Sequence, residues 1–569
     1  MTSLPANISE FMRWSWSEIE PYYRDLLEQP LDAVSVSAWL AEWTQLTSRL
    51  QEAQKRMYIA TTVDTTDQKA KTLYEAFLDQ VFPHAQAAEQ KLKEKLLASG
   101  LEPDGFEIPL RNLGAEAAIY RQQNVPLLSE ELKLDTQYYE ITAAQTVDWE
   151  GKEITLWELQ PVYLELDRSR REQAWRLAST RQLADRQIIN DLWVKLLHVR
   201  CQLADNAGFQ DYRAFRWQQL MRFDYTPQDC LHFHQAIETV VVPAAARIYE
   251  KRRKRLGLDS LRPWDLNVDP FGLPPLHPFT HVDELVEKIT AVLHQLDPEL
   301  GEYMAIMQQE NLLDLDTRLG KAPAGYCEDL SLARRPFIFL TAVGTHEDVL
   351  TLLHEGGHAF HVFESAHLPY YHQIQIGSEI AELASMSMEL LASPYLITDK
   401  GGFYSARDAA RARVEHLESI IRFWPYMAVV DSFQHWVYAN PSQANDPHTC
   451  DQIWGELWDR FMIGVDWSGL EEDKKSYWQR QSHIHQSPFY YVEYGIAQLG
   501  AVQVWQNSLK DKSRAIAAYR RALSLGGTHS LPELFAAAEV KFSFDEHTLI
   551  ESVTLLEETI IDLEKSIEL

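Results

Sequence analysis

The chain has 569 residues, of which 46% are hydrophobic and 24% are charged, and its formal net charge is −30. This composition supplies enough apolar material for a large core and excludes a disordered or collagen-like chain. Only 23 residues are glycine, which argues against a turn-rich all-β protein and predicts a mainly α-helical fold. A surface this acidic repels phosphate backbones and anionic lipids, so we expect neither a nucleic-acid nor a membrane partner.

One basic run, Lys251 to Arg255, interrupts the acidic composition just before Leu256 and Gly257. Consecutive cations can form a site for polyanions. Cations in the last turn of a helix also complement the helix macrodipole, and glycine commonly follows such an end. We interpret the run as the end of a helix.

The four cysteines, Cys201, Cys230, Cys327 and Cys450, are scattered and form no CxxC pair. They are too few and too dispersed for a disulfide framework or a zinc site built on cysteine pairs. The chain start lacks a basic segment followed by an apolar one, and no apolar run reaches roughly 18 residues. We therefore expect a cytoplasmic protein.

Helical periodicity dominates the first 255 residues. Trp39, Trp43, Leu46 and Leu50 recur at helical spacing and predict one amphipathic helix. The segment 147–152 has the composition of a turn between short strands.

The sequence changes character between residues 257 and 279, where several prolines predict an extended connection. The short apolar run 336–340 begins with proline, which favours an edge strand. From residue 345 onward helices dominate. The last one, with apolar residues from Leu549 to Ile567, is expected to start behind a Ser543-x-x-Glu546 capping box and to dock on its own domain.

The most informative segment begins at Thr345, which forms a predicted capping box with Asp348 and starts a helix. His354 and His358 are four residues apart on that helix, so both imidazoles can bind one tetrahedral zinc ion. Glu355 lies next to the first histidine, where it can accept a proton from the attacking water. This is the HExxH signature of zinc metallopeptidases.

The alternative is a helix whose histidines pack against neighbouring carboxylates, because in a chain with 20 histidines the pattern arises by chance in roughly one case in twenty. Gly356 and Gly357 argue against this alternative. Two glycines inside a helix cost about 2 kcal/mol relative to alanine, so a close approach there is needed, and a metal site with substrate passing over it would require one.

A zinc site needs a third protein ligand. The metzincin pattern is excluded because the positions that it requires to be glycine and histidine hold His361 and Glu364. The helix that begins near residue 378 offers Glu382, with Glu379 as the competing ligand. Glu389 lies on the same face and could hold a ligand imidazole by hydrogen bonding.

These residues carry a resemblance to a known family. The segment 354–358 followed by Glu382-x-x-Ser385-x-x-x-Glu389 resembles the oligoendopeptidase F family, relatives of thimet oligopeptidase. The segments 261–266, 325–327, 335–339 and 483–494 are similar to that family as well. The resemblance extends from about residue 200 to 500 and is a matter of pattern only in the N-terminal 150 residues.

The resemblance implies one Zn²⁺ per chain, bound by His354, His358 and Glu382, with Glu355 as general base. It also implies that His483, together with Tyr491 or Tyr494, binds the substrate carbonyl and the oxyanion that develops on it.

Phenolic and imidazole groups are suitable donors to such an oxyanion, and two tyrosines three residues apart can face one cavity. The alternative is that Tyr491 and Tyr494 are ordinary core aromatics with satisfied hydroxyl groups.

The resemblance further implies a large two-lobed helical body with a central substrate channel and a small β-sheet near the zinc helix. We place the N-terminal helical lobe at 1–190 and the catalytic lobe at 191–569, with helices of both walling the channel. The strand at 337–340 would pair with the peptide backbone. Relatives often carry a larger residue at the position of Gly356, which leaves the metal ligands unaffected and concerns only the local shape of the pocket.

The expected activity is therefore hydrolysis of internal bonds in short unfolded oligopeptides, by a metalloendopeptidase. If the channel shares the negative sign of the body, peptides of basic character would be favoured. Two alternatives remain: an HExxH metallocarboxypeptidase, and a catalytically silent, acidic helical protein that binds peptides. The oligomeric state is left open by the sequence.

Overall fold

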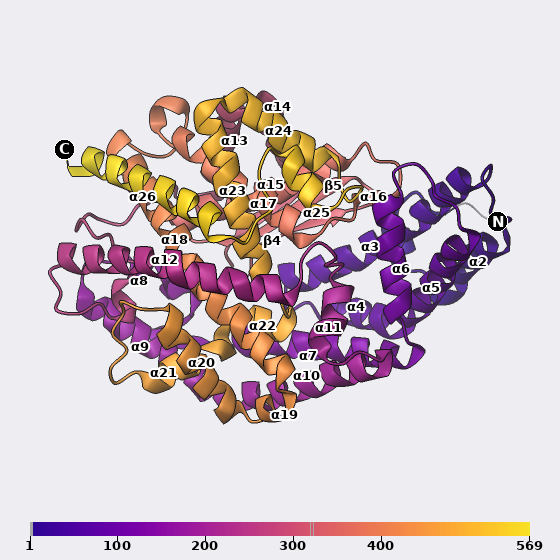
Figure 1. The fold of residues 1–569 in the computed structure, drawn as a ribbon, viewed down its shortest axis with the longest axis horizontal. Helices are drawn as coiled ribbons and strands as arrows, with labels where there is room; N and C mark the ends of the chain where they lie inside the picture. The colour runs from indigo at the N-terminus through magenta and orange to yellow at the C-terminus, as the bar shows by residue number, and fades with distance from the viewer. Residues whose placement is uncertain (1–3, 319, 323, 569) are drawn as a thin grey trace.

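The computed structural model describes residues 4–318, 320–322 and 324–568, and it is mainly α-helical with two small sheets, as predicted (Figure 1). The first helices are α1 (Ile8–Phe11), α2 (Trp16–Glu28), α3 (Val36–Val63), α4 (Gln68–Gln80), α5 (Phe82–Ser99), α6 (Glu107–Ile119), α7 (Val125–Ala143), α8 (Gln160–Tyr163), α9 (Arg168–Ala184) and α10 (Arg186–Ala207). The middle helices are α11 (Tyr212–Gln219), α12 (Pro227–Arg255), α13 (Val282–Leu296), α14 (Pro298–Gln309), α15 (His346–Ser365), α16 (Tyr371–Ile374), α17 (Ser378–Ala392) and α18 (Ala406–Ala439). The last are α19 (Pro441–Ala444), α20 (Pro447–Phe461), α21 (Glu471–Lys475), α22 (Ser482–Gln486), α23 (Tyr491–Lys510), α24 (Lys512–Ser524), α25 (Leu531–Ala537) and α26 (Glu546–Glu568). None of the described helices combines the length and the apolar surface that a membrane span requires.

The apolar side chains gather in separate cores. One core holds residues between Phe11 and Leu113, from the helices that form the indigo end of the molecule in Figure 1. The largest core begins at Leu134 and continues to Ile567. The position predicted for the lobe boundary, between residues 190 and 191, lies within α10.

Two short strands, β1 (Thr146–Trp149) and β2 (Lys152–Thr155), form the hairpin that the sequence predicts. A separate sheet contains β3 (Leu313–Asp316), β4 (Tyr326–Leu330) and β5 (Arg335–Ala342), in the order β3-β5-β4.

The prediction of an edge strand at residues 336–340 is wrong, because β5 is the central strand of its sheet. The Ile338 amide donates to the Leu312 carbonyl at 2.9 Å and thus points toward β3. Pro336 lies two residues earlier, so its nitrogen points to the same side of β5, but the pairing with β3 begins only at Ile338. Proline therefore costs no ladder hydrogen bond there. The edge strand next to the candidate site is β4, which is antiparallel to β5.

The basic run ends α12 and is neutralised by acidic side chains, as the helix-end interpretation predicts. Lys251 and Arg255 both pair with Glu564 of α26, and Arg252 lies 3.4 Å from Glu418. Helix α26 docks on α12 and α18 of the same chain, as expected. Its predicted capping box is wrong: the helix starts at Glu546, and it is Asp545 that accepts the Thr548 amide at 2.8 Å.

Helices α15 and α17 approach so closely that only glycine fits at the contact. A Cβ atom at Gly357 would lie 2.5 Å from both the carbonyl oxygen of Ala384 and the Cα atom of Ser385. At Gly356 the nearest atoms would be 3.6 and 3.7 Å away, in Phe360 and Met304, which is ordinary contact. The packing of α15 against α17 therefore requires glycine at position 357 and not at position 356.

The two glycines give a matched test. Gly357→Ala should lower the free energy of unfolding by roughly 2 kcal/mol, because its methyl group must push α17 away. Gly356→Ala should leave it unchanged or raise it by up to about 1 kcal/mol through helix propensity. Thermal and denaturant unfolding of both variants would measure this. Equal effects of the two substitutions would contradict the packing argument.

Candidate active site

Helix α15 begins at the predicted capping box, in which the Thr345 amide donates to Asp348 Oδ2 at 2.7 Å. Two turns further on, His354 and His358 lie on one face, with ring centroids 5.1 Å apart. One donor atom from each histidine and one from Glu382 all lie within 4.8 Å of one another. Three side chains on two helices thus converge on one point.

Glu382 comes from α17 and faces both histidines. Its Oε2 atom lies 3.2 Å from His354 Nε2 and 3.7 Å from His358 Nε2, and it accepts a hydrogen bond from the Ser385 hydroxyl at 3.0 Å. Burial opposes ionisation of Glu382, but the attraction of His358 and His354 outweighs it and lowers the pKa to about 2. The carboxylate is therefore held in the charged form that binds cations.

The competing ligand, Glu379, is engaged elsewhere. Its Oε1 atom accepts a hydrogen bond from the Tyr225 hydroxyl at 2.6 Å and lies 3.7 Å from Arg222 Nε. The structure thus brings Glu382 to the histidines and keeps Glu379 in a buried polar network on the other side.

Glu389 forms a hydrogen bond with His354 on the side of the ring that faces away from Glu382. Its carboxylate bridges His354 Nδ1 at 2.7 Å and His416 Nε2 at 2.9 Å. Burial opposes its ionisation, but its hydrogen bonds to His354 and His416 prevail and lower its pKa to about 2. His354 Nδ1 faces Glu389 and Nε2 faces Glu382, so this contact orients the ring with Nε2 toward the point where the three side chains converge.

Glu355 is buried and lines the same small cavity, of about 410 Å³, as the three converging side chains. Burial raises its pKa to about 7, although the charge of His354 acts in the opposite direction. A carboxylate with a pKa near neutrality is suited to general base catalysis.

His483 and Tyr494 lie together: His483 Nε2 is 3.3 Å from the Tyr494 hydroxyl, and both residues line a larger cavity. The ring of Tyr491 packs against Phe423 and Tyr426, with centroids 5.6 and 5.8 Å away. Of the two tyrosines, Tyr494 is the one that lines the cavity that holds Glu355.

Tyr490 is a residue that the sequence analysis missed. Its hydroxyl donates to Glu382 Oε1 at 2.7 Å, and it lines the cavity beside Tyr494. It precedes the first residue of α23, so its side chain does not follow the helical spacing that singled out its neighbours. The only available signal was its place in the aromatic run 489–491.

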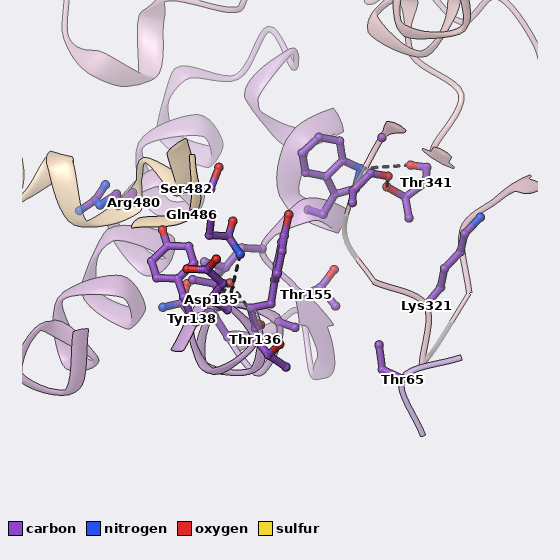
Figure 2. Close-up of a pocket in the computed structure, with 18 of the residues that line it drawn as sticks. Thr65, Asp135, Thr136, Tyr138, Thr155, Lys321, Thr341, Arg480, Ser482 and Gln486 are labelled. Carbon is purple, nitrogen blue, oxygen red and sulfur yellow. Dashed lines mark hydrogen bonds between the residues drawn. The ribbon is translucent and has the colours of Figure 1, made fainter. Parts of the chain in front are cut away.

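The larger cavity has a volume of about 1070 Å³ and shares Gly325 and Tyr494 with the smaller one. Figure 2 shows residues from distant segments around it: Thr65, Asp135, Thr136, Tyr138 and Thr155 from the N-terminal third, Lys321 from the segment before β4, Thr341 from β5, and Arg480, Ser482 and Gln486 at or near α22. Segments from both predicted lobes therefore wall this cavity.

The lining of the larger cavity does not share the strongly negative sign of the whole chain. Its charged residues are Asp135, Glu158, Arg318, Lys321 and Arg480, so cations slightly outnumber carboxylates. The smaller cavity is lined by the carboxylates of Asp329, Glu355 and Glu382 and by the cation Arg334, so the expected preference for basic peptides stays a prediction.

The chemistry of the converging donors fits a zinc ion. Two imidazole nitrogens and one carboxylate oxygen make up the set that catalytic zinc sites use, with one coordination position left for water or substrate. The backing carboxylate of Glu389 supplies the outer hydrogen bond that such histidines need.

Glu389→Ala should lower the zinc affinity roughly 10- to 100-fold, because His354 then loses the partner that orients its ring. Competition with a chromophoric chelator would measure this, with Glu379→Gln as control, since Glu379 faces Tyr225. An unchanged affinity in Glu389→Ala would show that the bridge does not support the site.

Known proteins show the same architecture. PZ peptidase A, solved with an inhibitor, is 28% identical with a TM-score of 0.92, and the match covers 98% of this chain and 100% of that one. A candidate oligoendopeptidase F from Bacillus anthracis str. Ames is 26% identical with a TM-score of 0.88, covering 97% of each chain.

Curated relatives match over shorter stretches. The oligoendopeptidase F homolog of Lactococcus lactis subsp. lactis (strain IL1403) is 24% identical over 349 residues, 58% of this chain and 53% of that protein. The chromosomal oligoendopeptidase F of Lactococcus lactis subsp. cremoris is 26% identical over 203 residues, 34% of this chain and 31% of that protein. The matches thus span about half and a third of the length of these relatives.

Family models match most of the chain. Residues 8–104 match the peptidase M3 N-terminal domain, and residues 164–553 match peptidase family M3. The resemblance inferred from the sequence is thereby confirmed. The chain belongs to peptidase family M3, a family of zinc metallopeptidases.

Proposed function

We propose that this protein is a zinc-dependent endopeptidase that hydrolyses internal bonds of short unfolded oligopeptides. The observation that carries the proposal is the convergence of His354, His358 and Glu382 at the cavity that also holds the buried carboxylate of Glu355. Membership of peptidase family M3 supports the same conclusion.

In this proposal His354, His358 and Glu382 together hold the one Zn²⁺ of the active site. When bound, the ion supplies Lewis-acid polarisation of the substrate carbonyl and activation of the attacking water. Glu355 takes the proton of that water and later delivers it to the leaving amine, the role for which its raised pKa suits it.

His483 and Tyr494 donate hydrogen bonds to the carbonyl oxygen as negative charge develops on it. The proton of His483 lies on Nε2, because Gln481 Nε2 donates to His483 Nδ1 at 2.8 Å, while Gln481 Oε1 accepts from Tyr426 at 2.8 Å. Burial lowers the pKa of His483 to about 4, so the imidazole is a neutral donor. Its Nε2–H group points to the Tyr494 hydroxyl.

The shape of the site supports oligopeptide substrates. The larger cavity joins the metal-binding cavity at Gly325 and Tyr494, and both are recessed among helices, so an extended peptide fits where a folded domain does not. The edge strand β4 borders the smaller cavity through Tyr326 and Cys327, which offers main-chain groups for strand addition by the peptide.

Glu355→Gln should keep the bound zinc and lose nearly all turnover, because the amide cannot take the proton from water. Zinc content and hydrolysis of a fluorogenic peptide, measured on the same preparation, test this. Hydrolysis at the wild-type rate would contradict the assigned base. Zinc retention without turnover in the wild-type protein itself would favour the silent peptide-binding alternative.

Substitution of Tyr494 and of Tyr491 should have different effects on kcat. Tyr494→Phe should lower kcat roughly 10²- to 10³-fold by removing a donor to the oxyanion. Tyr491→Phe should change kcat little, because that ring packs against Phe423 and Tyr426. Steady-state kinetics on one peptide would compare the variants, and equal losses in both would contradict the role given to Tyr494.

Substrate class can be tested by offering a ten-residue peptide and casein together. The peptide should be cut internally and casein should resist, because a recessed cavity of about 1070 Å³ has room for a short peptide and not for a long chain. Mass spectrometry of the products, with and without a zinc chelator, gives the positions of the cuts. Removal of single C-terminal residues would identify a carboxypeptidase instead.

A further inference from the structure

A second cluster of metal-binding side chains lies in the core between α12 and α18, two helices that pack against each other. Cys230 and His234 are four residues apart on α12, and Asp431 and His435 are four residues apart on α18, so each pair shares a helix face. The Cys230 sulfur and one donor atom each of Asp431 and His435 lie within 4.8 Å of one another. His234 Nε2 lies beside this group and forms a hydrogen bond with Asp431 Oδ2 at 2.9 Å.

The cluster is fully buried and incompletely satisfied. Asp431 and Cys230 have no exposed surface, and His234 and His435 are 3% and 4% exposed. Among the residues that the structure describes, neither Asp431 Oδ1 nor His435 Nε2 has a hydrogen-bond partner, although His435 Nε2 is 3.3 Å from Asp431 Oδ2. Buried polar atoms without partners cost free energy, and native proteins rarely leave two of them side by side.

We propose that Cys230, His234, Asp431 and His435 bind a structural zinc ion. Sulfur, imidazole nitrogen and carboxylate oxygen are all zinc ligands, and four protein ligands close the coordination shell, as in structural sites. One thiolate and one carboxylate balance the charge of Zn²⁺, so the buried site is neutral overall. Burial raises the pKa of the Cys230 thiol, and its proton is released to solvent when the Zn–S bond forms.

The surroundings of the histidines set their protonation. His234 Nδ1 lies 3.0 Å from the Ser432 hydroxyl, which accepts the Nδ1 proton when the metal takes the place of the Nε2 proton that now faces Asp431. His435 Nδ1 lies 3.4 Å from Arg213 Nη1. Metal binding through His435 Nε2 places the proton on Nδ1, so Arg213 then turns toward Asp211, 3.8 Å away.

Such an ion would stabilise α18, a helix whose residues contact the candidate active site. On α18, Gln434 is adjacent to His435 and accepts the Phe489 amide in the segment that leads to Tyr490. The same helix carries His416, the partner of Glu389. Because zinc would bind only to the folded state, its binding would stabilise α18 and the segments that contact it.

The first experiment counts metal ions. The wild-type protein, purified without chelators, should hold two zinc ions per chain by mass spectrometry. The catalytic-site variant His358→Ala should hold one, and Asp431→Asn should also hold one. One ion in the wild-type protein and none in His358→Ala would overturn the proposal in favour of a metal-free Asp431–histidine network.

The second experiment uses Co²⁺, which absorbs in the near ultraviolet when a thiolate binds it. The converging ligands of the candidate active site contain no sulfur, so the Co²⁺-loaded wild-type protein should show this band only through Cys230. Cys230→Ser should lose the band, while the controls Cys327→Ser and Cys450→Ser keep it. Absence of the band in the wild-type protein, or its loss in Cys327→Ser, would overturn the proposal even if Cys230→Ser fails to fold.

Discussion

The candidate site depends on the close approach of α15 and α17 at Gly357. With no side chain at this position, the backbone of α17 lies directly against α15. The Ala384 carbonyl at this contact also accepts a hydrogen bond from the Tyr519 hydroxyl at 2.9 Å, which holds α17 in place there. The spacing between the helices places Glu382 3.2 Å from His354. A wider spacing would leave a buried carboxylate without its partners, which is costly.

The second constraint acts on the segment between α22 and α23. Phe489 has a φ of 66°, a left-handed conformation that costs a side chain roughly 1–2 kcal/mol. Its amide donates to Gln434 and its carbonyl accepts from Arg222, so two buried side chains hold the turn in place. This turn directs Tyr490 to Glu382 and starts the helix that carries Tyr494 next to His483. Buried side chains thus position the two residues that we propose as donors to the oxyanion, and their packing offsets the cost of the left-handed turn.

Charge is distributed differently on the body and around the cavities. The chain carries a formal charge of −30, yet the cations that line the larger cavity are paired locally. Arg318 and Lys321 both bind Asp314, and Arg480 donates to Ser179. The net charge therefore affects solubility and the repulsion of polyanions. The local pairs determine the charge that lines the cavity.

The sequence by itself determined the helical class, the helix from its capping box at Thr345 to His358, and Glu355 beside the first histidine, because these features follow from local spacing. Local spacing could not choose between Glu379 and Glu382, since both lie on one helix. The tertiary structure distinguishes them, because Glu379 accepts a hydrogen bond from Tyr225. It also showed that β5 is a central strand, that Tyr490 reaches Glu382, and that Cys230 meets Asp431, because such contacts join segments far apart in the chain. Periodicity shows which residues share a face, and only the packing of whole helices shows what that face meets.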